Sequence, residues 1–226
     1  MERTVLVTGG TGGLGSAVTT ALLADGWRVV VPYVAAAELA RLPENDLLTT
    51  VEADLFDPDA VTACVAAASG HGAAPLRAVV NLVGGFAMGG RLHETPIEEF
   101  ERLLRLNLRP AYLICQAALP VLIDNGGGSI VCVSAQSALR PFSGASGYLT
   151  SKTAVLGLAA ALHAEYASQH VRVNTILPGV IDTPANRAQM PHADRTGWTP
   201  PAQIAETIRF LCSEASAAIR GAQIPV

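Results

Sequence analysis

Two residues four positions apart, Tyr148 and Lys152, carry the most direct chemical signal in the sequence. The segment Tyr148-Leu-Thr-Ser-Lys152 opens an expected helix, and a spacing of four places the phenol and the ammonium on one face. A nearby cation favours phenolate and lowers the pKa of tyrosine from about 10 towards neutrality. Such a tyrosine can exchange a proton with a carbonyl oxygen as a general acid or base. For this pair alone, the alternative is an ordinary helix face with an exposed lysine.

A second signal is the glycine-rich segment Thr8-Gly-Gly-Thr-Gly-Gly-Leu-Gly15, which follows an apolar, β-rich run and precedes helical spacing. Gly9 can supply a tight turn, Gly13 a close approach of a ligand to the backbone, and Gly15 the packing of helix on strand. The amino end of the following helix favours negative charge. An isolated match of this kind is often only a turn, but its place after the first strand indicates a dinucleotide pyrophosphate site.

Short apolar segments alternate with segments of helical periodicity along the chain. We expect strands over residues 4–8, 28–31, 48–52, 78–83, 129–134, 171–177 and 222–226. We expect helices over residues 16–24, 35–42, 58–68, 95–122, 148–170 and 201–213, with Thr95 as the N-cap of the fourth. Strands that are apolar on both faces and separated by helices are typical of a covered parallel sheet. The sequence therefore predicts a single doubly wound α/β domain over residues 1–226, with six to seven strands and helices on both faces.

One long irregular segment, residues 182–200, interrupts this alternation and contains Pro184, Pro191 and Pro200. Loops of this length in compact domains commonly carry binding residues or act as lids. We expect this segment to be a substrate-binding loop.

Composition excludes several classes of protein. The 226 residues are 50% hydrophobic and 15% charged, with a mean hydropathy of +0.36, which is typical of a compact globular chain. The formal charge of −4 gives no footprint for nucleic acid or an anionic membrane, and no uninterrupted apolar run is long enough to span one. Four separated cysteines and five histidines without ligand spacing indicate free thiols and no metal site. With no export signal visible, we expect a cytoplasmic protein.

Taken in order along the chain, these motifs resemble those of the classical short-chain dehydrogenase/reductase family. Thr8-Gly9-xxx-Gly13-x-Gly15 is similar to its cofactor motif, Asn81-Leu-Val-Gly-Gly85 to an altered Asn-Asn-Ala-Gly segment, and Tyr148 with Lys152 to its active-site pair. The resemblance implies a Rossmann-type fold that binds NAD(P). It also implies catalysis by Asn107, Tyr148 and Lys152, and cofactor contacts by Gly9, Thr11, Gly13, Leu14, Gly15, Tyr33, Asp54, Leu55, Asn81, Gly84, Tyr148, Lys152, Pro178, Gly179, Ile181 and Thr183.

The resemblance also implies a role for each catalytic residue. The tyrosine donates the proton, the lysine lowers its pKa and binds the nicotinamide ribose, and Asn107 holds a water in the proton relay. Each assignment has a structural alternative, because Asn107 could satisfy helix backbone, Asp54 could cap the following turn, and Thr183 could close a loop.

The sequence departs from the family at the catalytic serine, whose position 13 residues before the tyrosine is held by Ala135. Ser137, two residues later, is the candidate replacement, and Ser134 is the other neighbour. Strand alternation points the immediate neighbour of an inward position away, so inward rotation of either serine is expected to need a local distortion. The segment Ser134-Ala-Gln-Ser-Ala-Leu139 is similar to that of dihydropteridine reductases, whose serine position is also alanine. That similarity favours a conjugated substrate that needs no localised donor.

Cofactor choice depends on the end of the second strand, Val29-Val-Val-Pro-Tyr-Val34. NAD-preferring relatives place a carboxylate near Tyr33, and NADP-preferring ones place arginine near Val34 or at Gly12. Neither is present. Because no carboxylate repels a 2′-phosphate, we expect binding of both cofactors with a modest preference for NADP(H).

These residues together predict an NAD(P)H-dependent oxidoreductase that reduces a carbonyl or conjugated C=O/C=N group of a small organic molecule. The alternative is a regulatory or scaffolding protein that binds NAD(P) but has lost catalysis, and the retained Tyr148, Lys152 and Asn107 argue against it. We also expect a homotetramer or homodimer. Its basis is that the helices over 95–122 and 148–170 carry more apolar positions than one sheet face covers: Leu103, Leu106, Ala111, Leu113, Leu156 and Leu162.

Overall fold

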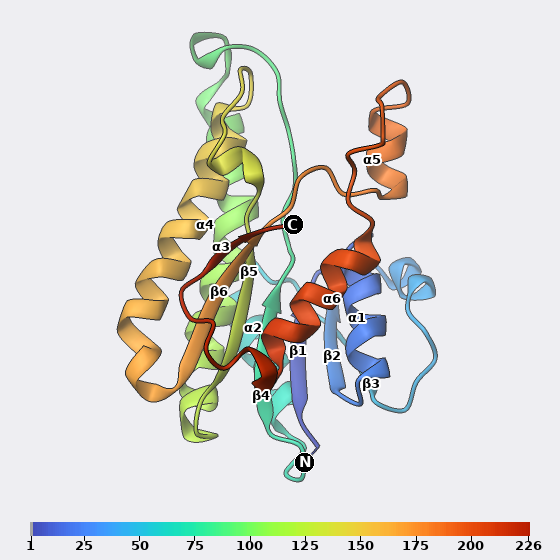
Figure 1. Ribbon diagram of the computed structural model, residues 1–226, viewed down its shortest axis with the longest axis vertical. Coiled ribbons are helices and arrows are strands. Elements are labelled where there is room, and N and C mark those ends of the chain that lie inside the picture. Colours follow the sequence, from blue (N-terminus) through green and yellow to red (C-terminus); the bar gives the residue numbers. More distant parts are fainter. Residues whose placement is uncertain (1) are drawn as a thin grey trace.

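The protein folds around one seven-stranded parallel sheet with the strand order β3-β2-β1-β4-β5-β6-β7 (Figure 1). The computed structural model describes residues 2–226. The strands are β1 (Thr4–Thr8), β2 (Arg28–Tyr33), β3 (Leu48–Glu52), β4 (Leu76–Asn81), β5 (Gly128–Val133), β6 (Val171–Leu177) and β7 (Gln223–Pro225). The α-helices are α1 (Gly15–Ala24), α2 (Pro58–Ser69), α3 (Ile97–Asp124), α4 (Ser146–Tyr166), α5 (Pro184–Gln189) and α6 (Pro201–Cys212). The predicted doubly wound α/β fold is confirmed.

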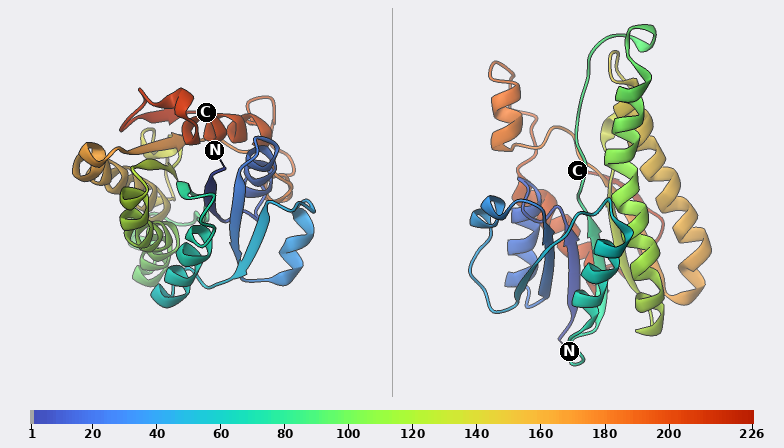
Figure 2. Two further views of the ribbon diagram at one scale, coloured as in Figure 1. Left: turned by 90° about the horizontal axis from the view of Figure 1, so that it is seen from below. Right: turned by 180° about the vertical axis from the view of Figure 1, so that it is seen from behind.

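Two hydrophobic cores form because successive side chains of each strand point to opposite faces of the sheet. On one face, Leu6 and Val79 pack with residues of α2, α3 and α4. On the other face, Val5 and Val80 pack with residues of α1 and α6. Both views in Figure 2 show these two helical layers on either side of the sheet.

The strand order reverses beside β1, whose two neighbours are β2 and β4. In doubly wound sheets, ligands bind beyond the carboxyl ends of the strands at such a reversal. The segment after β4 and the short helix α5 both extend past this end of the sheet (Figure 1). The topology therefore places the glycine-rich segment and the start of α4 around one crevice.

Four expected elements differ from the structure. The helix over 35–42 is a 3₁₀-helix, η1 (Ala36–Arg41), because none of its residues is buried and it has no apolar face to pack. The fourth strand lies two residues earlier than expected, at Leu76–Asn81. Thr95 does not cap α3, since its hydroxyl donates to backbone carbonyls and Pro96 holds the N-cap position. The irregular segment 182–200 contains α5, and Ile181 pairs with Thr199 at its base.

The expected basis for oligomerisation is wrong, because α3 and α4 pack against each other within one chain. Leu103, Leu113, Leu156 and Leu162 are each at most 9% exposed. By length and apolar composition alone α3 could cross a membrane, but half of its most apolar stretch is buried in this domain. It is the central helix of one face of the sheet.

Candidate functional site

The glycine-rich segment between β1 and α1 folds so tightly that its glycine positions have no room for a side chain. Gly9 has a φ of 66°, a conformation that L side chains rarely adopt. A Cβ atom on Gly15 would lie 1.9 Å from the Gly9 carbonyl oxygen, and one on Gly13 would lie 2.9 Å from the Thr183 methyl carbon. The backbone at the amino end of α1 is therefore bare, which fits the pyrophosphate of a dinucleotide.

Two residues of η1, Glu38 and Arg41, form hydrogen bonds with the glycine segment. The sequence analysis did not single them out. The buried Thr11 hydroxyl donates to Glu38 Oε2 at 2.7 Å, and Arg41 Nη1 donates to the Thr11 carbonyl oxygen at 3.2 Å. Glu38 and Arg41 also face each other at 3.9 Å. One acidic and one basic side chain thus stand beside the end of β2, where the adenosine ribose is expected. Their sequence signal is weak, because an exposed Glu and Arg three residues apart are typical of any surface helix.

The other predicted residues of the adenosine side lie where the sequence places them. Tyr33 is the last residue of β2 and is half-buried. The Asp54 carboxylate accepts a 2.9 Å hydrogen bond from the Phe56 amide, which is the turn-capping role given above as an alternative. Leu55 is buried in the core beside α2. These contacts fix the segment after β3 and leave a cofactor role for Asp54 as a prediction.

Asn81, the last residue of β4, is buried among sulfur atoms. Its amide nitrogen lies 3.4 Å from Cys115 Sγ and 3.9 Å from Cys132 Sγ, and its Oδ1 atom has no hydrogen-bond partner in the described part of the chain. Gly84 follows three residues later, and a Cβ atom there would lie 2.6 Å from Asn107 Oδ1 and 3.1 Å from Lys152 Nζ. Gly84 therefore brings this segment directly against two of the predicted catalytic residues.

The Asn107 side chain, in the middle of α3, is almost fully buried and bonds to protein on both of its polar atoms. Its Oδ1 accepts from the Gly85 amide at 2.9 Å, and its Nδ2 lies within hydrogen-bond distance of the Gly85 carbonyl and of Ser151 Oγ. Its Nδ2 also donates to the Leu103 carbonyl at 3.2 Å, so Asn107 satisfies helix backbone, which is the structural alternative given above. Asn107 pins the segment after β4 to α3 and α4, and any contact with a relay water stays a prediction.

Lys152 is the only lysine of the chain and is 7% exposed. Its Nζ donates to the Val133 carbonyl oxygen at 3.2 Å. Burial lowers the pKa of Lys152 to about 8, and the neighbouring Cys132 thiol opposes that shift. Its charge is therefore present below that pH and lost above it.

Tyr148, one turn before Lys152 on α4, is half-buried at the same end of the sheet. Burial raises the pKa of Tyr148 above its ordinary value, and a hydrogen bond with the Ser137 hydroxyl partly offsets this. The expected lowering by Lys152 is wrong here, because burial is the largest effect and the ammonium is directed to Val133. Tyr148 is consequently a protonated phenol at neutral pH.

The structure distinguishes the two candidate serines. Ser137 lies in a single 3₁₀ turn, η3 (Gln136–Ala138), that places its hydroxyl against Tyr148. Ser134 is buried, and its hydroxyl donates to the Lys152 carbonyl oxygen at 2.7 Å. The expectation that either serine needs a distortion to turn inward is wrong for Ser137, since the chain has already left the strand after Val133.

Two aromatic side chains that the sequence analysis did not identify extend from the Tyr148 ring, one against it and one against its neighbour. The Phe86 ring meets it edge-on at 4.9 Å between centroids, and Phe142 lies 6.5 Å from Phe86. Phe86 and Phe142 are 50% and 43% exposed. The loop after β4, which carries Phe86, is joined to the loop before α4, which carries Phe142. The Gly89 amide of the first donates to the Gly144 carbonyl of the second at 2.7 Å.

The segment after β6 closes the other side of the crevice. Pro178 is buried, Gly179 donates to the Val226 carbonyl, and Ile181 bonds to the Asn186 side chain. The Thr183 hydroxyl accepts from the Asn186 amide and caps α5. Because Thr183 also lies against Gly13, this segment reaches across to the glycine loop. Leu14, the residue before α1, is half-buried beside it.

Comparison with known proteins agrees with this geometry. Residues 3–194 match the family model for short chain dehydrogenases. The chain is 32% identical over 242 residues to 2-(R)-hydroxypropyl-CoM dehydrogenase of Xanthobacter autotrophicus, covering 99% of this chain and 96% of that protein. It is 32% identical to the 3-oxoacyl-(acyl-carrier-protein) reductase MabA of Mycobacterium bovis, covering 100% of this chain and 92% of that one.

The solved structure of a short-chain type dehydrogenase/reductase from Mycobacterium ulcerans superposes with a TM-score of 0.92. The two chains are 27% identical, and the match covers 100% of this chain and 88% of the other. The chain therefore belongs to the short-chain dehydrogenase/reductase family of NAD(P)-dependent oxidoreductases.

Proposed function

We propose that the protein reduces the carbonyl group, or a conjugated C=O/C=N group, of a small apolar molecule with NADPH, and that Tyr148 is the proton donor. The observation that carries this proposal is the position of Tyr148 one helical turn before the buried Lys152 on α4, with the Ser137 hydroxyl near enough to offset part of the rise in the pKa of Tyr148. All three residues lie at the carboxyl end of the sheet beside Gly84, where the bare glycine segment also lies. A proton donor, a second hydroxyl and a cation are thus gathered beside a dinucleotide site.

The bound cofactor supplies the hydride, and the protein supplies the proton and the electrostatic environment. Burial keeps the Tyr148 phenol protonated, so it can donate to the oxygen on which negative charge develops. The Ser137 hydroxyl offers a second donor to the same oxygen. The buried Lys152 ammonium is proposed to hold the nicotinamide ribose of the cofactor beside Gly84, and not to act on the phenol directly.

The substrate is proposed to be apolar because Phe86, which contacts Tyr148, and Phe142, which contacts Phe86, are exposed, as is Met88 two residues after Phe86. These large side chains leave apolar surface in contact with water, which is typical of a binding site. Residues 182–200 face them across the crevice as the proposed substrate loop.

The finer preference for NADP(H) over NAD(H) rests on Tyr33 and Arg41. Tyr33 places no carboxylate at the end of β2, and Arg41 carries a cation beside Thr11 that can meet a 2′-phosphate. Glu38 opposes this preference, but Arg41 lies 3.9 Å from its carboxylate and partly neutralises it.

The rival function is a regulatory or scaffolding protein without catalysis. It predicts no turnover in an assay where the proposed function predicts turnover. A panel of aldehydes, ketones, quinones and dihydropterins is assayed by loss of nicotinamide absorbance with NADPH and with NADH. Turnover of an apolar carbonyl supports the proposal. Tight cofactor binding without turnover of any compound supports the rival.

We further propose that the protein works as a homodimer or homotetramer in the cytoplasm. Tyr112 on α3 and Phe210 on α6 are 51% and 38% exposed, and both can be covered by another subunit. The cysteines are free thiols buried in the domain, which fits a reducing compartment. A monomer by light scattering at micromolar concentration would contradict the oligomer.

A further inference from the structure

A cavity of about 670 Å³ lies at the end of the sheet opposite to the glycine segment. Its wall includes Arg3, Trp27 and Pro75, which immediately precede β1, β2 and β4. It also includes the glycines before β5 and the first residues of β6. Because the dinucleotide crevice lies at the carboxyl ends of the strands, this amino-end cavity is separate from the proposed catalytic site.

The amino-end cavity is positively charged although the whole chain is acidic. Arg3, Arg77, Arg172 and Arg220 line it, and the acidic residues of its wall are Glu2 and Glu214. The formal charge of the chain is −4. The local excess of cations is therefore a property of this cavity and not of the surface as a whole.

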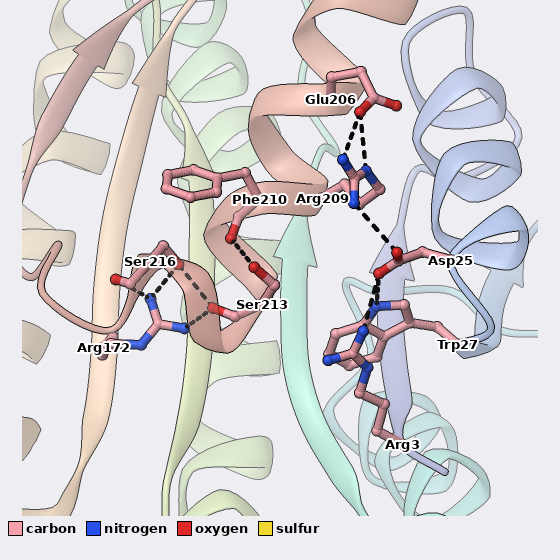
Figure 3. Close-up of polar contacts among 9 residues, drawn as sticks. All are labelled: Arg3, Asp25, Trp27, Arg172, Glu206, Arg209, Phe210, Ser213 and Ser216. Carbon is pink, nitrogen blue, oxygen red and sulfur yellow. Dashed lines mark hydrogen bonds and ion pairs between the residues drawn. The ribbon is translucent and has the colours of Figure 1, made fainter. Parts of the chain in front are cut away.

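Arg172 is the most unusual of these arginines, since it is only 8% exposed although it lies at the amino end of β6, beside Ser129 of β5 and before the part of the strand that pairs with β7. Its guanidinium donates to the Ser213 carbonyl at 3.1 Å, and to the Ser216 carbonyl and hydroxyl at 3.2 and 2.9 Å (Figure 3). These bonds place it at the negative end of the α6 dipole. All the partners are neutral, and no carboxylate of residues 2–226 lies within 4.0 Å of it.

Buried charges are ordinarily paired with an opposite charge. Burial lowers the pKa of Arg172, the more distant Glu214 carboxylate and Cys212 partly oppose that shift, and the charge of Arg220 adds to it. Arg220 itself bonds only to the Ala217 carbonyl within residues 2–226. Two like charges thus lie close together at one wall of the cavity.

Arg3, on the other side of the end of α6, differs from Arg172 because its charge is paired directly with a carboxylate. It bonds to Asp25 at 2.9 Å and stacks on the Trp27 ring at 4.1 Å, and Asp25 also accepts from Arg209 (Figure 3). Arg77 has Glu214 at 4.0 Å. Glu214 thus acts on both Arg77 and Arg172, and one carboxylate among three arginines leaves an excess of positive charge on the side of Arg172 and Arg220.

We propose that the amino-end cavity binds a small organic phosphate, with its phosphoryl oxygens at Arg172 and Arg220. Arginine is suited to phosphate because its planar donors match the oxygen geometry. The cavity is larger than a phosphate group, and the partly exposed Pro75 and Ala217 give the remaining wall apolar area for the body of the ligand. This site is independent of the catalytic proposal.

The test uses inorganic pyrophosphate as the probe and isothermal titration calorimetry on the full chain. Saturating NADP⁺ is present throughout, so that the glycine segment cannot take the probe. In a Trp198→Phe background, Trp27 is the only tryptophan, and its fluorescence reports events at the cavity wall. We expect a dissociation constant below about 1 mM, with a change in Trp27 emission that saturates at the same concentration.

Arg220→Gln and Arg172→Gln should each weaken this binding about tenfold or more, because each removes charged hydrogen bonds to the oxyanion. Arg102→Gln is the matched control, since it removes the same charge from an exposed pair with Glu99 on α3. If Arg172→Gln fails to fold, the exposed Arg220→Gln still decides. No saturable heat with pyrophosphate, or an equal loss in Arg220→Gln and Arg102→Gln, would overturn the proposal.

Discussion

The Ser134 hydroxyl donates a 2.7 Å hydrogen bond to the Lys152 carbonyl oxygen. This bond ties the end of β5 to the helix that carries Tyr148 and commits Ser134 to a structural contact. Ser137 is left as the serine beside Tyr148. A hydroxyl two residues after Ala135 therefore offers a second explanation beside the conjugated-substrate one, and the two make opposite predictions for Ser137.

Ser137→Ala should lower kcat for carbonyl reduction by about 10²–10³-fold, as loss of one oxyanion donor does in other enzymes. Ser134→Ala is the matched control: it should leave kcat within a few-fold and lower the free energy of unfolding by about 1 kcal/mol. Steady-state rates and urea unfolding of both variants check this. Full activity in Ser137→Ala with the fold intact would favour the conjugated-substrate explanation.

Gly84→Ala should abolish most of the activity, because its Cβ atom would collide with Asn107 Oδ1 at 2.6 Å and crowd Lys152 Nζ at 3.1 Å. Gly157→Ala serves as the control on the exposed face of α4, where a Cβ atom meets nothing within 4 Å. That change should stabilise the protein by about 0.5–1 kcal/mol, because alanine is the better helix former. Comparable activity of the two variants would show that Gly84 does not position the site.

The pH profile of kcat/KM should fall as pH rises through about 8, where the Lys152 ammonium loses its proton. The sign follows from burial, which disfavours the charged form and brings its loss into the working range. Lys152→Arg keeps the charge and should move this decline to higher pH. Because Lys152 is the only lysine, nitrogen-15 NMR of lysine-labelled protein measures its pKa directly. A side-chain pKa near 10.5 would contradict the prediction.

Arg41→Gln should weaken NADPH binding about tenfold while changing NADH binding little, since it removes a charged contact with the 2′-phosphate. Glu38→Gln should act in the opposite direction and favour NADPH. Fluorescence titration of both reduced cofactors measures the two ratios. A wild-type preference for NADH of tenfold or more, about 1.4 kcal/mol, would show that Tyr33 and Arg41 do not set the choice.

Local sequence patterns predicted the succession of strands and helices along the chain. The glycine segment and the Tyr148–Lys152 spacing are local signals, because backbone conformation and helix geometry fix them within a few residues. The contacts of Glu38 and Arg41 with Thr11, and of Ser137 with Tyr148, depend on how distant segments pack. Periodicity could not predict them. The same limit explains why Leu156 was expected at a subunit interface, although it is buried within the chain.

The most direct measurement is the rate of NADPH oxidation by Tyr148→Phe with the best carbonyl substrate, together with its affinity for NADPH. Removing the proton donor should lower turnover by about 10²–10⁴-fold, with cofactor affinity nearly unchanged because the ring and the glycine segment remain. Turnover close to that of the wild type, in protein that binds NADPH normally, would contradict the assignment of Tyr148 as the proton donor.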